Sequence, residues 1–189
     1  MSNLLSILTT GLHVNPTFAP KTGRSFGDGL YFADVYDKSK SYTRSSGDTE
    51  YLLLCEVDLG KSFVETNYHP WRNQYDIKEK ALKYDSLHVL GKHVPEDTGR
   101  VVTREGYTLP LGKIVKRKSE NSDDGYSRFG GLDYSEYVVK DETKVVVRFI
   151  LKIGTGKDSS EHFEATDNGS MDEYDSDDED HSSGSTDSS

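Results

Sequence analysis

The fold is decided by one stretch of the chain, Phe26-Gly27-Asp28-Gly29-Leu30-Tyr31-Phe32-Ala33-Asp34. Within it, Gly27-Asp28-Gly29 predicts a turn, because glycine adopts backbone angles that strain other residues. Leu30–Ala33 predicts a short strand. Asp34 is typical of a helix N-cap, since a carboxylate accepts hydrogen bonds from the first free amides, and Val35–Tyr42 is predicted to form a short helix. The stretch therefore joins a turn, a strand and a helix.

Strands dominate on either side of this stretch. One more short helix is predicted at Asn3–Thr10, where Gly11 ends it. The predicted strands are Tyr51–Leu59, Tyr134–Val139 and Val145–Ile153, with a hairpin formed by Val101–Arg104 and Tyr107–Leu109.

The remaining segments show weaker patterns. Residues 61–100 are predicted to alternate strand fragments with loops, and residues 112–131 to be loop. In the last strand, Val145, Val147, Phe149 and Leu151 are expected to share one face. The fold class that follows is α+β, with a mainly antiparallel sheet and few short helices.

The acidic charge of the chain is concentrated near its end. Residues 154–189 contain 12 acidic residues and one basic residue, a formal charge of −11. Residues 1–153 contain 22 basic and 21 acidic residues, a formal charge of +1. A highly charged segment with few apolar residues cannot offset the entropy of ordering its backbone. We expect one domain over residues 1–153 and a disordered acidic tail over residues 154–189.

Composition disfavours several classes of protein. The single cysteine, Cys55, excludes an intrachain disulfide, and its apolar neighbours favour a small core residue over a nucleophile. We expect no membrane span, no secretory leader, no metal site and no sequence-specific nucleic-acid binding by the nearly neutral body. Lys113–Lys118 has the pattern of a nuclear address, but a solvated loop is the preferred interpretation.

Six segments in a fixed order carry a more specific signal. They are Asn3–Leu12, Phe26–Asp34, Lys38-Ser39 with Tyr42, Leu54–Gly60, Val89–Lys92 with Pro110–Gly112, and Asp133–Val139. Together they resemble the catalytic domain of the poly(ADP-ribose) polymerases over residues 3–153. Gly29–Asp34 and Tyr134–Val139 are the most specific parts of this resemblance.

The resemblance implies an ADP-ribosyltransferase fold and an enzyme that uses NAD+ as co-substrate without a metal. Such an enzyme transfers ADP-ribose to protein acceptors and releases nicotinamide. The expected acceptors include the chain itself and histones, and the expected location is the nucleus, with the cytoplasm as the alternative. Retention of Glu136 implies that poly(ADP-ribose) chains are elongated.

The resemblance also assigns a role to each of several residues around the nicotinamide end of NAD+. Tyr42 is expected to stack on the nicotinamide ring, Tyr31 to line the other side, and Ser39 to bind the carboxamide. Glu136 is expected to bind the ribose 2′-hydroxyl and to polarise the acceptor, with Lys38 supporting the site. Without the resemblance, Tyr31 is interpreted as a core residue and Glu136 as part of a solvent face.

The chain also departs from the family pattern. Members carry a His-Gly-Ser/Thr segment before the position of Asn3, whereas this sequence begins Met1-Ser2-Asn3. The expectation is a fragment of a longer enzyme. The alternative is a catalytically impaired interaction module whose acidic tail binds basic partners.

Three substitutions within the matched region bear on how NAD+ is held. His13 stands where many relatives have an arginine near the adenosine half of NAD+, so we expect it to bind the co-substrate. Arg24 replaces an aromatic residue that often flanks the donor pocket, and Asp28 replaces a basic residue in the turn.

Overall fold

The computed structural model describes residues 2–16, 23–43, 49–70, 72–118 and 131–154. All of them belong to one compact unit, Met1–Lys157. The predicted acidic tail lies outside the described residues from position 155 onward.

Short helices and mostly antiparallel strands make up the described part of the chain, which confirms the predicted α+β class. The helices are α1 (Ser2–Thr10), α2 (Tyr36–Lys40) and α3 (Gln74–Ala81), with the 3-10 turns η1 (Asp97–Gly99) and η2 (Glu142–Lys144). The strands are β1 (Leu30–Phe32), β2 (Thr49–Val57), β3 (Ser62–Glu65), β4 (Ser86–Val89), β5 (His93–Pro95), β6 (Arg100–Val102), β7 (Thr108–Pro110), β8 (Ile114–Lys116), β9 (Glu136–Val139) and β10 (Val145–Gly154).

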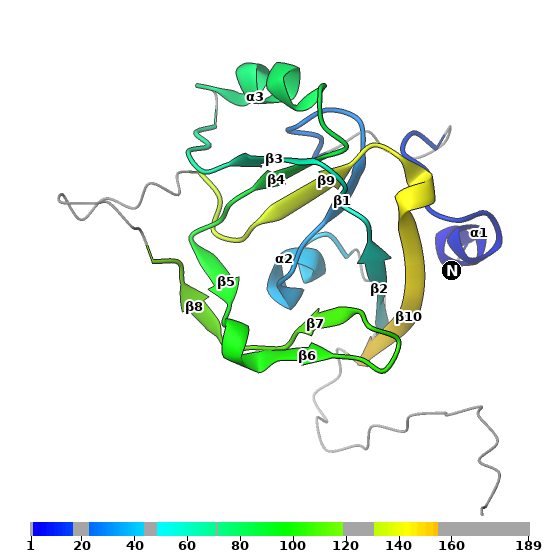
Figure 1. Ribbon diagram of the computed structural model, residues 1–189. Coiled ribbons are helices and arrows are strands. Elements are labelled where there is room, and N and C mark those ends of the chain that lie inside the picture. Colours follow the sequence, from blue (N-terminus) through cyan, green and yellow to red (C-terminus); the bar gives the residue numbers. More distant parts are fainter. Residues whose placement is uncertain (1, 17–22, 44–48, 71, 119–130, 155–189) are drawn as a thin grey trace, which may run out of the picture. The chain divides into compact units, whose positions relative to one another are not determined.

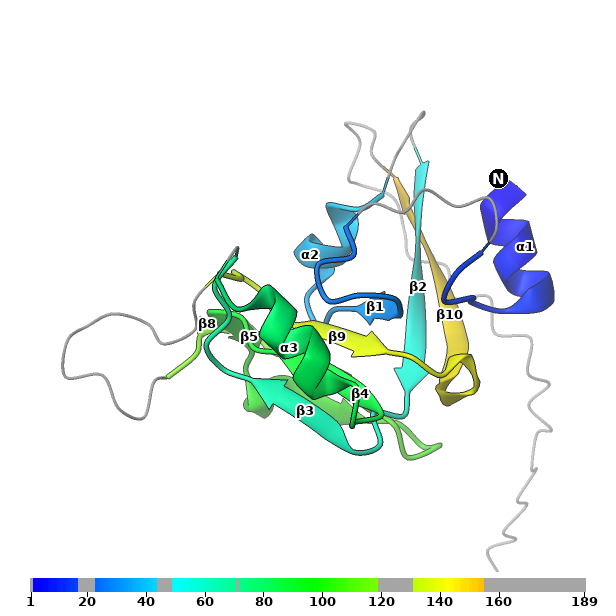
Figure 2. The ribbon, with the colours of Figure 1, turned by 90° about the horizontal axis from the view of Figure 1, so that it is seen from above.

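A four-stranded sheet in the order β1-β9-β4-β3 forms the centre of the molecule (Figure 1). β9 pairs antiparallel with both β1 and β4, whereas β3 and β4 are parallel. Helix α3 lies over β3 and β4 (Figure 2) and buries Ile77 and Ala81. These two side chains belong to the main apolar core together with Phe26, Tyr68, Leu87, Val89 and Val138. Burial of this cluster stabilises the sheet and so determines where β1 and β9 lie.

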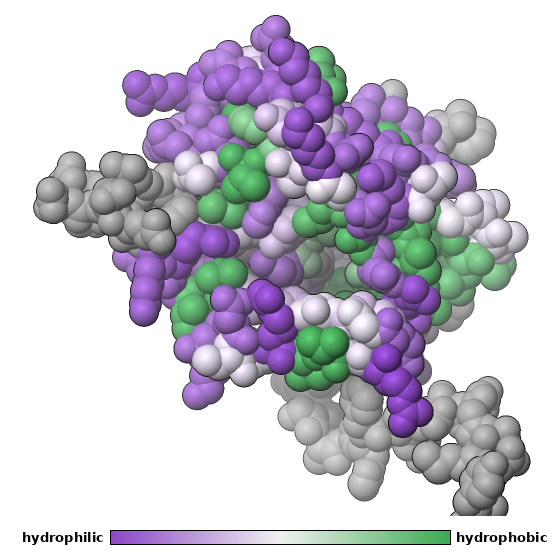
Figure 3. All heavy atoms as spheres, in the orientation of Figure 1, coloured by the Kyte–Doolittle hydropathy of each residue, from purple (hydrophilic) through white to green (hydrophobic). Residues whose placement is uncertain are grey.

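Strands β2 and β10 form a long antiparallel ribbon beside the central sheet. The register shifts between Val147 and Phe149, so the predicted strict alternation along β10 holds only as far as Val147. The bulge leaves Phe149 48% exposed and Ile150 43% exposed. Figure 3 shows hydrophobic residues at the surface on the right-hand side of the molecule, where β2 and β10 lie in Figure 1.

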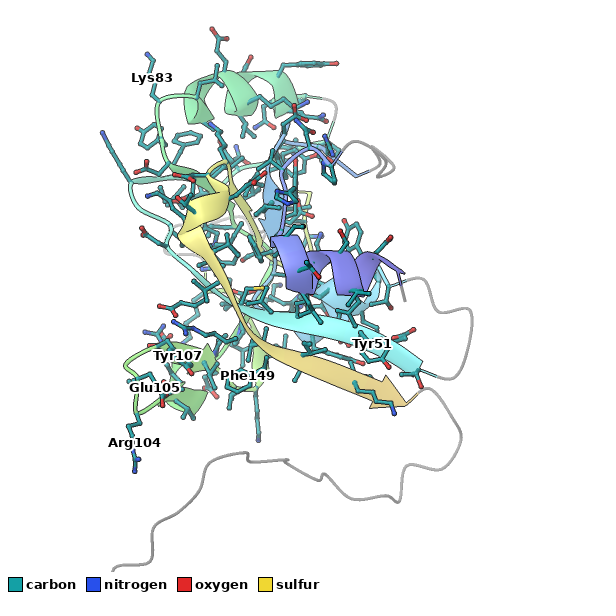
Figure 4. The ribbon with its side chains drawn as sticks, turned by 90° about the vertical axis from the view of Figure 1, so that its right-hand side faces the viewer. Tyr51, Lys83, Arg104, Glu105, Tyr107 and Phe149 are labelled. Atoms are coloured by element: carbon teal, nitrogen blue, oxygen red, sulfur yellow. The ribbon has the colours of Figure 1, made fainter. Side chains whose placement is uncertain are left out.

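The predicted hairpin is confirmed, because β6 pairs antiparallel with β7 around Gly106. Its turn reaches β10, where the Arg148 guanidinium lies 5.3 Å from the ring centroid of Tyr107 (Figure 4). The prediction of loop over residues 112–131 is wrong at β8, which pairs antiparallel with β5. Residues 119–130 of that range are outside the described part of the chain.

Helix α1 was predicted correctly, whereas helix α3 was missed. Helix α1 ends as predicted, with Gly11 at a φ of 87° and its amide donating to the Ile7 carbonyl over 2.8 Å. The prediction for residues 61–100 missed α3, which has no side-chain cap bond at Asn73 and buries only Ile77 and Ala81. Since these are tertiary contacts, the local pattern carries little sign of this helix.

Cys55 lies half-buried on β2, and burial raises the pKa of its thiol to about 11. A thiol that stays protonated is a poor nucleophile, which agrees with the predicted packing role. No helix in the described ranges is long and apolar enough to cross a membrane.

Candidate active site

A pocket of about 320 Å³ opens where β1, α2 and the start of β9 meet. It is lined by Gly23, Arg24, Tyr31, Phe32, Ala33, Lys38, Ser39, Tyr42 and Glu136. Five of the six site residues predicted from the sequence thus lie around one cavity, although Glu136 is remote in sequence from the other four. The antiparallel register that pairs Tyr31 with Val138 brings the two segments together.

Glu136 is the acidic residue that lines this pocket. It is 8% exposed, and its Oε1 lies 2.7 Å from the Lys38 ammonium. A buried carboxylate requires a charged or hydrogen-bonding partner, because desolvation of an unpaired charge is costly. Lys38 supplies that partner from α2. The pair joins β9 to α2 across the pocket.

The Tyr31 hydroxyl is occupied by the turn that precedes β1. It donates to the Gly27 carbonyl over 2.7 Å and accepts from the Phe26 amide over 3.0 Å. Burial raises the pKa of Tyr31 to about 12, so the phenol remains protonated at neutral pH. Gly27 has a φ of 94°, which confirms the predicted turn. The Tyr31 side chain therefore lines the pocket, while its hydroxyl stabilises the turn through two hydrogen bonds.

Tyr42 and Ser39 also line the pocket. Tyr42 is 63% exposed, beyond the C-terminus of α2, and its ring centroid lies 5.9 Å from Lys38 Nζ. An exposed aromatic ring at the mouth of a pocket has a free face on which a planar ligand can stack. Ser39 is half-buried on α2, one residue from Lys38.

His13 is the predicted site residue that the structure does not bring to this pocket. Its Nδ1 lies 2.8 Å from Glu142 Oε2, and its side chain is 45% exposed. The Val14 amide donates to the same carboxylate over 2.6 Å. Arg24, by contrast, lines the pocket, with NH1 2.8 Å from Asp28 Oδ1. Arg24 therefore adds a second cation to the pocket, beside Lys38.

Asp34 does not cap α2, which corrects the sequence prediction. The N-cap position is Val35, without a side-chain cap bond, and α2 spans only Tyr36–Lys40. The Asp34 carboxylate instead accepts a hydrogen bond from the Tyr137 hydroxyl over 3.0 Å. The physical reason is that Tyr137, a half-buried phenol 103 residues away, competes successfully for the carboxylate.

The Asp34–Tyr137 bond was not predicted from the sequence. Tyr137 stacks on His88 with ring centroids 4.1 Å apart, and burial lowers the pKa of His88 to about 4, so it is neutral at pH 7. Burial raises the pKa of Asp34 and of Tyr137. Asp34 lies in the connection between β1 and α2, so its bond to Tyr137 joins this connection to β9 next to Glu136. Tyr137 lies within the Tyr134–Val139 motif, but nothing in the local sequence indicates that its hydroxyl reaches Asp34.

Replacing Tyr137 with phenylalanine is expected to lower the free energy of unfolding by about 2 kcal/mol, because the Asp34 carboxylate loses its donor while the ring stack is kept. Denaturant unfolding followed by circular dichroism measures this. Tyr75→Phe is the matched control, since Tyr75 is 80% exposed on α3. Equal losses in the two variants would argue against a structural role for the Asp34–Tyr137 bond.

Comparison with known proteins agrees with this arrangement. Residues 1–155 match the family model described as the poly(ADP-ribose) polymerase catalytic domain. The chain belongs to this family. It is 36% identical over 154 residues to poly [ADP-ribose] polymerase tankyrase of Caenorhabditis elegans, an alignment that covers 79% of this chain and 6% of that protein.

Two other relatives show the same pattern. Identity to poly [ADP-ribose] polymerase 2 of Homo sapiens is 36% over 162 residues, covering 81% of this chain and 25% of the relative. Identity to poly [ADP-ribose] polymerase 1 of Arabidopsis thaliana is 36% over 155 residues, covering 81% and 14%. The chain therefore spans a quarter or less of the length of these three polymerases. Membership of the family implies NAD+ as the substrate of the domain.

Proposed function

We propose that this chain supplies an NAD+-dependent ADP-ribosyltransferase site that transfers ADP-ribose to protein acceptors and releases nicotinamide. The observation that carries the proposal is the buried Lys38–Glu136 pair, with atoms 2.7 Å apart, at the wall of a pocket that also presents Tyr31, Ser39 and Tyr42. Family membership over residues 1–155 supports it independently.

The chemistry explains why a carboxylate is needed. The bond between nicotinamide and ribose breaks with its electron pair leaving on nicotinamide, so positive charge develops on the ribose. The acceptor oxygen then bonds to the ribose carbon and loses its proton. Glu136 is assigned the ribose 2′-hydroxyl and the acceptor, because its carboxylate stabilises positive charge and accepts a hydrogen bond. Lys38 holds this carboxylate in position at Oε1.

The remaining side chains are assigned to the leaving group. Tyr42 stacks on the nicotinamide ring from the open side, Tyr31 closes the inner side, and the Ser39 hydroxyl binds the carboxamide. The acceptor in this proposal is a protein, and the chain itself is the most accessible one to assay. With Glu136 retained, the same site elongates poly(ADP-ribose). His13 is assigned to the adenosine half, outside the pocket that Glu136 lines.

Binding of nicotinamide to the full chain tests the assignment of the pocket. Tyr42→Ala is expected to weaken nicotinamide binding about 5- to 10-fold, because stacking on one ring contributes about 1 kcal/mol or slightly more. Titration calorimetry or ligand-detected NMR measures the dissociation constant. The control is Tyr36→Ala, since Tyr36 is 44% exposed at the start of α2 but does not line the pocket. An unchanged affinity of the Tyr42→Ala variant for nicotinamide would contradict the assignment of Tyr42 to the nicotinamide ring.

A further inference from the structure

Strand β8 is an exposed edge with a basic face. It pairs with β5 along one side, and none of the other described strands pairs with its second side. In Figure 1 it lies outside β5 at the rim of the ribbon. The side chains of Lys113, Lys116 and Lys118 are exposed, as are Ile114 (45%) and Val115 (37%). An open edge offers unpaired backbone amides and carbonyls to another extended chain.

Positive charge is concentrated around this edge. Residues 92–118 contain seven basic and three acidic residues, a formal charge of +4, whereas residues 1–153 together carry +1. Nearby cations are paired, Lys92 with Asp133 at 3.1 Å and Arg100 with Asp97 at 2.7 Å. Lys113, Lys116 and Lys118 have no ion pair with any residue in the described ranges. Three ammonium groups on β8 and its flanks are thus not engaged in ion pairs within the described ranges.

The chemistry of the edge favours a peptide over a nucleic acid. Binding of single-stranded nucleic acid without base readout relies on aromatic rings for stacking, and residues 113–118 contain none. A strand edge with exposed Ile114 and Val115 between lysines matches an extended peptide that alternates acidic and apolar residues. We propose that β8 binds an acidic, extended segment of the acceptor protein by strand addition. This inference rests on the proposed function, because it names the class of acceptor.

The edge is coupled to the active site through two short connections. Tyr134, His93 and Lys116 form one row across neighbouring strands, with a parallel bridge between Tyr134 and His93. Arg117 donates through Nε to the Gly91 carbonyl and through NH2 to Ser135 Oγ, each over 3.2 Å. Ser135 directly precedes Glu136 in the chain. A peptide paired with β8 therefore extends the row of paired strands that ends at Tyr134, two residues before Glu136 on β9.

Strand spacing gives the geometry of the complex. Neighbouring strands lie about 4.8 Å apart, so a peptide added outside β8 runs roughly 14 Å from the strand of Tyr134. An extended residue spans about 3.3 Å, and hence about four residues are needed to cover that distance. The modified residue of the acceptor is therefore separated by at least about four residues from the segment that β8 binds.

The test uses the full chain and a fluorescein-labelled peptide of eight alternating glutamate and valine residues. Replacing Lys113, Lys116 and Lys118 with glutamine is expected to weaken binding about tenfold, measured by fluorescence anisotropy at low salt. The control replaces Lys78, Lys80 and Lys83 with glutamine, an equal change of charge on and after α3. Lys83 extends from the molecule in Figure 4, and this control is expected to keep the parent affinity.

Hydrogen exchange and the salt dependence of affinity distinguish strand addition at β8 from other modes of binding. Hydrogen exchange should slow at the β8 amides when the peptide binds, and affinity should fall as salt is raised. Equal weakening in both lysine variants, or no protection of β8, overturns the proposal. Tighter binding of a single-stranded oligonucleotide that is lost in the β8 variant also overturns it, in favour of nucleic acid.

Nicotinamide binding separates this inference from the proposed function. The β8 variant should bind nicotinamide as the parent does, because none of its three lysines lines the pocket. If the parent chain binds the peptide but does not bind nicotinamide, the proposed function is contradicted. The proposal that β8 binds an acidic peptide is then retained.

Discussion

Substitution of glutamine for Glu136 is expected to lower the rate of ADP-ribose transfer at least about 100-fold, while the chain remains folded. Glutamine keeps the size of the side chain and a hydrogen bond to a ribose hydroxyl. It loses the negative charge that stabilises the developing positive charge on the ribose. Lys38, 16% exposed, also loses its charged partner, and we expect a cost of about 1 kcal/mol in the free energy of unfolding.

Automodification with labelled NAD+ measures the first effect, and release of nicotinamide gives a second readout of the same step. The control is Glu56→Gln, which removes an exposed carboxylate that pairs with Arg148 on the β2–β10 ribbon. Its transfer rate should match that of the parent. Equal labelling in the Glu136 variant and the parent would remove Glu136 from the mechanism.

The second large effect is expected from Gly91→Ala, which should lower the free energy of unfolding by about 3 kcal/mol. A Cβ at position 91 would lie 2.2 Å from the Tyr134 carbonyl carbon and 2.5 Å from the Ser135 nitrogen. Both atoms belong to the backbone that leads into Glu136, so no side-chain rotation relieves the clash. The Gly91 amide also donates to Ser135 Oγ over 3.2 Å.

Chemical denaturation of the variant measures this loss, and nicotinamide affinity reports on the displaced pocket. Gly154→Ala is the matched control, because a Cβ there meets no atom within 4 Å. If the Gly91 variant is as stable as the control, the backbone of Tyr134 and Ser135 moves away from the new Cβ without a loss of folding free energy. In that case the close approach of Gly91 to β9 has no part in positioning Glu136.

Local sequence patterns predicted the elements whose stability is local. The Gly27 turn, the helix ended by Gly11 and the β6–β7 hairpin were all recognised, because each depends on backbone preferences of a few adjacent residues. Helix α3 and strand β8 were missed, since they exist through burial of Ile77 and Ala81 and through pairing with β5. The alternation predicted along β10 was wrong after its bulge, which no local pattern announces.

The sequence by itself determined the family, the order of the segments and five of the residues that line the pocket. These follow from motifs, which record chemistry residue by residue. Only the tertiary structure decided that Lys38 lies 2.7 Å from Glu136, that Asp34 binds Tyr137 rather than capping α2, and that His13 lies apart with Glu142. The physical reason is that strand register joins residues about 100 positions apart, and register depends on the packing of the whole core rather than on neighbours in the chain.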